Sequence, residues 1–121
     1  MVGSYEQTSD AGGRPEGPRV RIEPVQWDGE GRVALIGEID IANVDDAEAA
    51  LTPMAASGAP LVLDLVGLTY CDSQGVAMLF RLARQARDRG GALTVANPQG
   101  IVSRVLEITR LDEVVDIIID L

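Results

Sequence analysis

Histidine is absent from this 121-residue chain, and Cys71 is its only cysteine. Imidazole is the commonest general base in enzymes, a common metal ligand and the usual partner of a serine or cysteine nucleophile. Its absence excludes Ser-His-Asp sites, Cys-His sites and histidine-based zinc sites, and one cysteine can form neither a CxxC site nor an intramolecular disulfide. The sequence signatures of nucleotide-binding and calcium-binding loops are also missing. We therefore expect a protein that is not an enzyme and that needs no metal or other cofactor.

Lysine is absent as well, so all 10 basic residues are arginine, against 19 acidic residues and a formal net charge of −9. Such a chain repels phosphate backbones and anionic lipids, which argues against nucleic acid or a membrane as the main partner. No segment approaches the ~20 consecutive apolar residues of a membrane-spanning helix, and no apolar run follows the first residues as a secretory signal requires. These features predict a cytoplasmic protein, monomeric or weakly dimeric, whose partner is another protein.

Composition divides the chain into two parts. Residues 1–18 are rich in Gly, Ser, Pro and polar groups and show no apolar periodicity, so we predict a disordered N-terminal tail. Residues 19–121 are expected to form a single domain, because the whole chain is shorter than one typical domain of about 150 residues.

The pattern of apolar residues within 19–121 predicts an α/β domain. Two alternating segments joined by a turn at Asp28-Gly29 predict an antiparallel hairpin. Asn43 is a favourable N-cap for the first helix, and Pro53 should kink that helix or end it early. The order of elements predicts a mixed sheet of four to five strands that starts with the hairpin and is covered by three to four helices. The expected strands are residues 20–24, 33–39, 61–65 and 92–96, and residues 114–119 are either a strand or a short helix. The expected helices begin at Asn43, at Gln74 and at Asn97-Pro98.

A polar motif follows the strand predicted for residues 61–65. Asp72, Ser73, Gln74 and Gly75 stand where the strongest predicted helix begins. At a helix amino end the backbone N–H groups point outward and the dipole favours negative charge, so a hydroxyl there is well placed to carry a phosphate. A simpler interpretation is that Asp72 or Ser73 is only the N-cap, which satisfies backbone amides of the first turn. The two interpretations are compatible.

Two segments of the sequence resemble a known family. The segment L-V-L-D-L-V-G-L-T-Y-C-D-S-Q-G-V, residues 61–76, resembles the signature of STAS domains, in particular that of bacterial anti-sigma factor antagonists. The segment Gly37-Glu38-Ile39-Asp40 resembles a second mark of the family, G-E-[LI]-D. The order and spacing of the predicted elements agree from Val20 to the C-terminus, so the resemblance implies a STAS fold over residues 19–121.

The resemblance also implies a function. In that family an anti-sigma factor with serine-kinase activity phosphorylates the serine that follows the motif aspartate, which is Ser73 here. The unphosphorylated antagonist binds the anti-sigma factor and releases sigma factor, the phosphorylated form dissociates, and a serine phosphatase restores binding. The implied protein is a phosphoprotein that regulates transcription, as in a stress response. The implied partner-binding residues are Glu38, Asp40, Asn43, Asp72, Ser73, Gln74 and Gly75.

Several alternatives remain open at this stage. Thr69 is the nearest other hydroxyl that could accept a phosphate, and Glu38 and Asp40 could be no more than a solvated strand end. Cys71 is interpreted as a small apolar residue rather than a redox sensor. A second candidate function is a STAS subunit that binds the ATPase of a lipid-transport ABC complex, although the D-S-x-G motif favours the first. A series of arginines on the strongest predicted helix is either a partner-facing stripe or simply its solvated face: Arg81, Arg84, Arg87 and Arg89.

Overall fold

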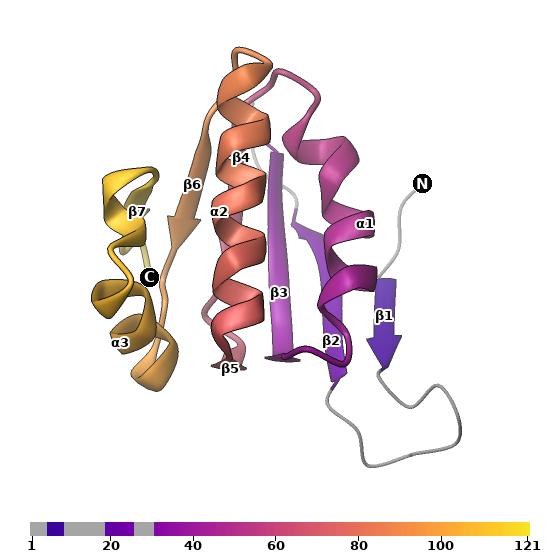
Figure 1. Cartoon of the computed structure of the whole chain (residues 1–121), viewed down its shortest axis with the longest axis vertical. Coiled ribbons are helices and arrows are strands. Elements are labelled where there is room, and N and C mark those ends of the chain that lie inside the picture. Colours follow the sequence, from indigo (N-terminus) through magenta and orange to yellow (C-terminus); the bar gives the residue numbers. More distant parts are fainter. Residues whose placement is uncertain (1–4, 9–18, 26–30) are drawn as a thin grey trace.

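The computed structural model describes residues 5–8, 19–25 and 31–121. They form a sheet with helices α1 and α2 lying side by side across one face, whereas α3 contacts β5 and η1 (Figure 1). The strands are β1 (Tyr5–Thr8), β2 (Arg19–Val25), β3 (Gly31–Ile39), β4 (Leu61–Asp64), β5 (Leu68–Cys71), β6 (Leu93–Ala96) and β7 (Asp116–Ile118). The helices are α1 (Val44–Ala55), α2 (Ser73–Asp88) and α3 (Gly100–Ile108), with a short 3-10 helix η1 (Leu111–Glu113).

The sheet is mixed, as the sequence predicts. Among the described residues it has seven strands in the order β1-β2-β3-β4-β6-β7, with β5 beside β3. The pairs β1–β2 and β2–β3 are antiparallel, so the predicted N-terminal hairpin is confirmed. The pairs β3–β4, β4–β6 and β6–β7 are parallel, because a helical crossover joins the strands of each pair. The turn predicted at Asp28-Gly29 lies outside the described residues.

Strand β3 changes its parallel partner along its length. Its first half pairs with β4 and its last residues pair with β5, and the register shifts between Gly37 and Glu38. Gly37 has a φ of +114°, and a Cβ there would lie 2.3 Å from the carbonyl oxygen of Arg19. Only glycine fits this irregularity without strain. The shift directs the carboxyl end of β3 toward β5 and the start of α2.

Two strands, β1 and β5, are absent from the sequence prediction and raise the number of strands above four to five. β5 has four residues, which is too short to show a clear apolar alternation. β1 lies within residues 1–18, so the prediction of a wholly disordered tail is wrong for Tyr5–Thr8, which pairs with β2. The edge of β2 offers backbone groups that even a polar segment can satisfy. Residues 1–4 and 9–18 lie outside the described ranges.

The hydrophobic core lies between the sheet and the helices. Val20 and Ile22 of β2 are buried in it, whereas the alternate residue Arg21 is exposed on the opposite face. The apolar stripe predicted for α2 is also buried, with Phe80 at its margin. The largest fully buried side chains are Ile22, Leu35, Ile39, Leu51, Leu63, Leu65, Leu68, Met78, Leu79, Leu82, Leu106 and Leu111.

Helix ends differ from the prediction at α1. Asn43 precedes α1 but makes no side-chain cap, and the helix continues past Pro53 to Ala55 instead of ending early. A proline so close to the end interrupts few backbone bonds, and the burial of Leu51 and Ala55 holds the last turn in place.

At the C-terminus, residues 116–118 form the strand β7 rather than a helix. No helix in the described ranges is both long and apolar enough to cross a membrane.

Candidate functional site

The candidate site lies where the carboxyl ends of β3 and β5 meet the amino end of α2. Parallel pairing sets Glu38 opposite Tyr70 and Ile39 opposite Cys71. The backbone N–H of Asp72 then donates to the carbonyl of Ile39 at 3.2 Å, which extends this pairing into the start of the helix. The β3–α1 turn (residues 40–43) and the segment 72–75 are therefore brought together, as the resemblance implies.

Asp72 accepts hydrogen bonds from both segments of the site, the β3–α1 turn and the start of α2. Its Oδ1 accepts hydrogen bonds from the backbone N–H groups of Gln74 and Gly75 at 2.9 and 3.0 Å, so Asp72 is the N-cap of α2. Its Oδ2 accepts from the N–H of Ile41 at 3.1 Å. One carboxylate thus caps the helix and holds the neighbouring turn, because a carboxylate offers two acceptor oxygens.

Ser73 is the first residue of α2, and its side chain is exposed. Its hydroxyl makes no hydrogen bond to any residue that the structure describes. The first turn of α2 contains no acidic residue, and the helix dipole there favours negative charge. Of the two sequence interpretations, the cap belongs to Asp72, and the hydroxyl of Ser73 stays accessible to another protein.

Thr69, the alternative hydroxyl, lies differently. Its Oγ1 donates to the carbonyl of Gly37 at 3.0 Å, so it ties β5 to the irregularity in β3. Modification of Thr69 would remove this hydrogen bond, whereas modification of Ser73 would break no side-chain contact within the described residues. The geometry favours Ser73 as an acceptor.

Asn43 is buried, and its side chain holds the β3–α1 turn together instead of forming part of the exposed surface. Its side chain is 1% exposed, accepts from the N–H of Asp40 at 3.0 Å, and donates to the carbonyl of Glu38 at 2.9 Å. Asp40 in turn accepts from the N–H of Ala42 at 2.9 Å. Asn43 therefore shapes the turn from beneath and does not stand on the surface, unlike Glu38, which is exposed.

Ile41 is the site residue that sequence reasoning missed. Its side chain is 73% exposed at the tip of the β3–α1 turn, and Tyr70 nearby in β5 is 43% exposed. The signal in the sequence was an isoleucine within an otherwise polar turn, where its side chain has no hydrophobic core to pack into. Exposed apolar groups beside polar ones are typical of protein-binding surfaces.

Gly75 and Cys71 account for the close approach of α2 to the sheet. A Cβ on Gly75 would lie 2.5 Å from the Cys71 Sγ and 3.0 Å from Ile39 Cγ2. Gly75 is buried, so its role is spacing rather than direct contact. Burial, together with the charge of Asp72, raises the pKa of the Cys71 thiol to about 12. The thiol therefore stays protonated, which agrees with the interpretation of Cys71 as a small apolar residue.

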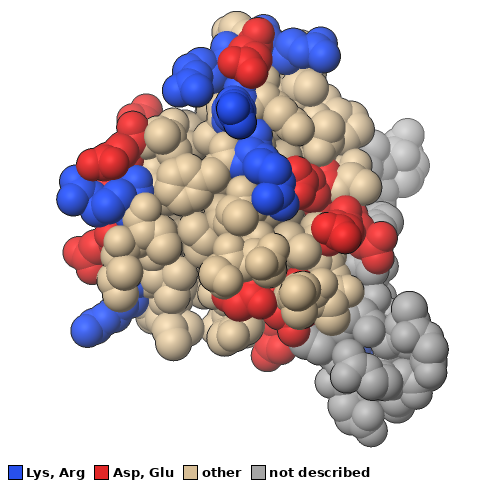
Figure 2. Space-filling view, viewed as in Figure 1, with Lys and Arg blue, Asp and Glu red and all other residues tan. Residues whose placement is uncertain are grey.

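Acidic groups gather at this end of the molecule. Figure 2 shows red patches at the lower end of the face covered by α1 and α2, where α2 begins in Figure 1. Asp40 and Asp72 are both partly exposed, and Gln74 beside them is exposed and neutral. A further negative charge on Ser73 would add to this field, although the helix dipole makes it tolerable to the fold.

Replacing Asp72 with alanine is expected to cost about 1 kcal/mol of stability through the lost cap. Because the same change releases the amide of Ile41, hydrogen exchange should accelerate at Ile41 as well as at Gln74 and Gly75. Urea unfolding and amide exchange measure the two effects. Asp88→Ala, which removes an exposed carboxylate near the other end of α2, is the matched control. Unchanged exchange at Ile41 would contradict the double role of Asp72.

Comparison with known proteins gives one family match. A family model described as "Mlab, STAS domain" matches residues 24–119. The chain is also similar to the anti-sigma-B factor antagonist of Bacillus subtilis (strain 168), with 28% identity over 98 residues, which are 81% of this chain and 90% of that protein.

Solved structures share the same fold. The crystal structure of an anti-sigma factor antagonist from Mycobacterium paratuberculosis has a TM-score of 0.72 and 24% identity, covering 87% of this chain and 88% of that one. The anti-sigma factor antagonist SpoIIAA in its unphosphorylated form has a TM-score of 0.67 and 18% identity, covering 83% and 88%. These similarities confirm the fold that the two sequence motifs imply.

Proposed function

Because the chain belongs to the STAS domain family, we propose that it is an anti-sigma factor antagonist that binds its partner through the β3–α1 turn and the amino end of α2. The similarity to the Bacillus subtilis anti-sigma-B factor antagonist supports this class of partner. The chemistry of the surface agrees with it, because exposed Ile41 and Tyr70 stand beside polar groups of the turn. Such a mixture suits a protein interface better than a small-molecule site.

Phosphorylation of Ser73 is the switch in this proposal. The observation that carries it is the exposed hydroxyl of Ser73 at the first position of α2, next to a cap that a different residue supplies. A phosphate can be added there without removing a side-chain contact of the described fold. The domain should therefore remain folded in both states, and the change of charge acts on binding.

The phosphate weakens binding through its charge. It adds about −1.5 to −2 charges at pH 7 beside the carboxylates of Asp72 and Asp40. When the phosphate is buried against a partner, it loses its hydration, and no cation near it among the described residues compensates for that loss. A difference of about 5.5 kcal/mol between the two forms would turn a complex populated 99:1 into one populated 1:99.

The partners follow from this switch. The antagonist is a substrate and a binding protein rather than an enzyme, so the kinase activity belongs to the anti-sigma factor and dephosphorylation to a separate serine phosphatase. Binding of the unphosphorylated form releases sigma factor in the cytoplasm, and phosphorylation reverses that release. Neither nucleic acid nor a membrane takes part directly.

The test uses the full chain, the purified anti-sigma factor kinase and ATP. We expect mass spectrometry to find one added phosphate, mapped to Ser73, and loss of complex formation in calorimetry. Ser73→Ala should not be phosphorylated and should bind within about 3-fold of wild type, because a methyl group adds no charge. Ser73→Glu should stay folded and bind more weakly, although one carboxylate carries less charge than a phosphate.

Thr69→Ala is the matched hydroxyl control, and it should still be phosphorylated. Phosphate on Thr69, or unchanged phosphorylation of Ser73→Ala, would contradict the assignment of the acceptor. If no serine kinase binds and the protein instead forms a stable complex with the ATPase of a lipid transporter, the transporter function replaces the one proposed.

A further inference from the structure

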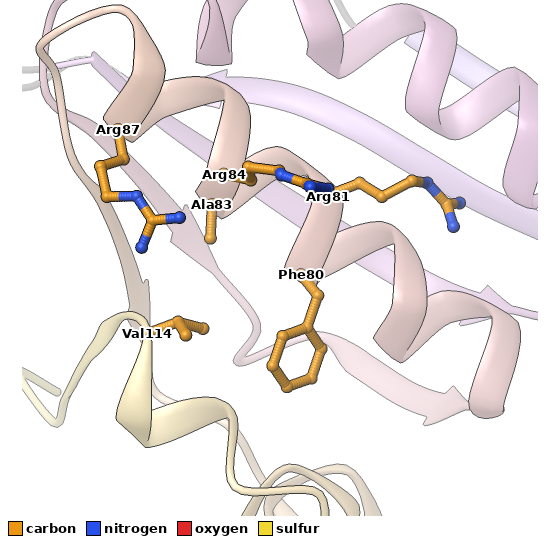
Figure 3. Close-up of a pocket in the computed structure, with 6 residues that line it drawn as sticks. All are labelled: Phe80, Arg81, Ala83, Arg84, Arg87 and Val114. Carbon is orange, nitrogen blue, oxygen red and sulfur yellow. The ribbon is translucent and has the colours of Figure 1, made fainter.

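The second half of α2 borders a hollow that lies away from the Ser73 site. Figure 3 shows this hollow between α2 and the chain after η1, with Phe80 extending beside Val114. We name it the arginine groove, and it has a volume of about 240 Å³. Its lining residues are Phe80, Arg81, Ala83, Arg84, Arg87 and Val114.

The groove is positive on a strongly negative protein. Arg81 is bound to Glu48 of α1 at 2.6 Å. Arg84 and Arg87 make no ion pair with any residue in the described ranges, and no acidic residue lines the groove. In Figure 2 a blue stripe runs along the upper half of α2, where these arginines lie. Arg84 and Arg87 thus line one groove without an ion pair among the described residues, on a chain whose net charge is −9.

Carboxylates lie near the Arg87 end of the groove, because Asp112, Glu113 and Asp116 line an adjoining hollow together with Arg87. Glu113 of η1 pairs with Arg110 at 2.9 Å, and Asp112 approaches the same arginine at 3.7 Å. Both partners of each pair are more than half exposed, and the pairs draw the acidic side chains of η1 toward Arg110. Arg84 lines the groove but not that hollow, and no acidic residue is among the residues that line the groove itself.

The floor of the groove is apolar. Val114 is 44% exposed and Phe80 is half-buried, so both present apolar surface to the groove. A volume of about 240 Å³ falls below the roughly 300–1,000 Å³ typical of small-molecule sites. It is large enough for one or two apolar side chains of a peptide.

We propose that the arginine groove binds an acidic segment of a partner protein, with Asp or Glu side chains on Arg84 and Arg87 and an apolar side chain between Phe80 and Val114. Charge complementarity selects this occupant, because guanidinium groups form strong, planar hydrogen bonds with carboxylates. Nucleic acid and anionic membranes fit less well. They favour clusters of many basic residues, whereas this groove has two unengaged arginines on an acidic molecule.

The proposal is independent of the switch at Ser73. Arg84 lies 11 residues along α2 from Ser73, which places it about 16 Å farther along the helix axis. An acidic segment would be repelled by the carboxylates at the Ser73 end of α2 and attracted by the arginines of the groove. The groove therefore determines which part of a partner can lie along the second half of α2.

The test is a selection of short random peptides, displayed on phage, on the full-length protein. We expect the selected peptides to be rich in Asp and Glu around a Leu, Phe or Trp. Fluorescence anisotropy should show about 10-fold weaker binding to Arg84→Glu and to Arg87→Glu. Arg104→Glu, which reverses an exposed arginine on α3 outside the groove, should bind like wild type. Affinity should also fall between about 50 and about 200 mM salt.

Four outcomes would overturn the proposal. They are selected peptides without an acidic bias, equal weakening by Arg104→Glu, full binding by Arg84→Glu and Arg87→Glu, and tighter binding of a single-stranded oligonucleotide than of any selected peptide. Phosphorylation of Ser73 has no part in these measurements, so a failure of the proposed switch leaves their outcome unchanged.

Discussion

Replacing Leu63 with aspartate is expected to unfold the domain. Leu63 is 0% exposed in β4 and pairs with Val33 of β3 on one side and Val95 of β6 on the other. The change removes a buried leucine, which alone costs about 2–5 kcal/mol, and adds a carboxylate with no cation facing it in the core. The summed cost is comparable with the whole free energy of unfolding of a typical domain, about 5–15 kcal/mol.

Circular dichroism and urea titration check this prediction. Leu63→Asp should lose its cooperative transition, whereas Leu63→Ala should keep the transition at a lower midpoint. Arg84→Glu is the surface control, and it should unfold at a midpoint close to that of wild type because its side chain is exposed. A cooperative transition of Leu63→Asp near the wild-type midpoint would show that the centre of the sheet is misassigned.

Arg32→Leu is expected to destabilise the domain, because it leaves the carboxylates of Asp64 and Asp120 without their cation. The side chain of Arg32 is 5% exposed and points away from the helices, since it alternates with core residue Val33. It donates to Asp64 at 2.9 Å and to both carboxylate oxygens of Asp120 at 2.8 and 2.9 Å. Asn97 donates to the same Asp120 carboxylate at 2.8 Å and accepts from the Asp120 backbone N–H at 2.8 Å.

The pH dependence of stability distinguishes this network from a simple packing effect. Hydrogen bonds from Arg32, and secondarily from Asn97, lower the pKa of Asp120 from 3.8 to about 2. Because the folded pKa lies below the unfolded one, Asp120 stabilises the fold above about pH 4, and this contribution is lost as the pH falls toward 2.

The stability difference between wild type and Arg32→Leu should therefore narrow between about pH 5 and about pH 2. Arg104→Leu is the control, and it should show a small difference that does not change with pH. A gap between wild type and Arg32→Leu that stays constant across this range would contradict an ionic origin.

Local patterns were sufficient to predict the central part of the fold. The apolar run 61–65 and the amphipathic period of α2 each reveal one element without help from distant residues. The D-S-x-G motif sits between them, so its place at a helix amino end was also predictable. The pairing of β3 with β5 was not, because it depends on a backbone irregularity at Gly37 that no pattern of apolar residues expresses.

Residues whose roles depend on distant partners were predicted poorly. An asparagine before a helix can cap it or turn back to hold the preceding chain, and local sequence does not distinguish these uses, so Asn43 was assigned to the cap. The sequence assigned no role to Arg32, because its partners Asp64 and Asp120 are 32 and 88 residues away along the chain. Both cases concern polar side chains, whose energy depends on which hydrogen-bond partner the fold brings to them.

The separate roles of two adjacent residues at the start of α2 bear on how regulation can be gained or lost in evolution. The helix depends on the carboxylate of Asp72, whereas the hydroxyl of Ser73 supports no side-chain contact within the described part of the chain. Under the proposed function, a single substitution of Ser73 by another small residue would therefore leave a folded protein that binds constitutively. The reverse substitution would restore a phosphorylation site on an intact scaffold. The proposed covalent control at this position could thus evolve in one mutational step, without passing through an unstable intermediate.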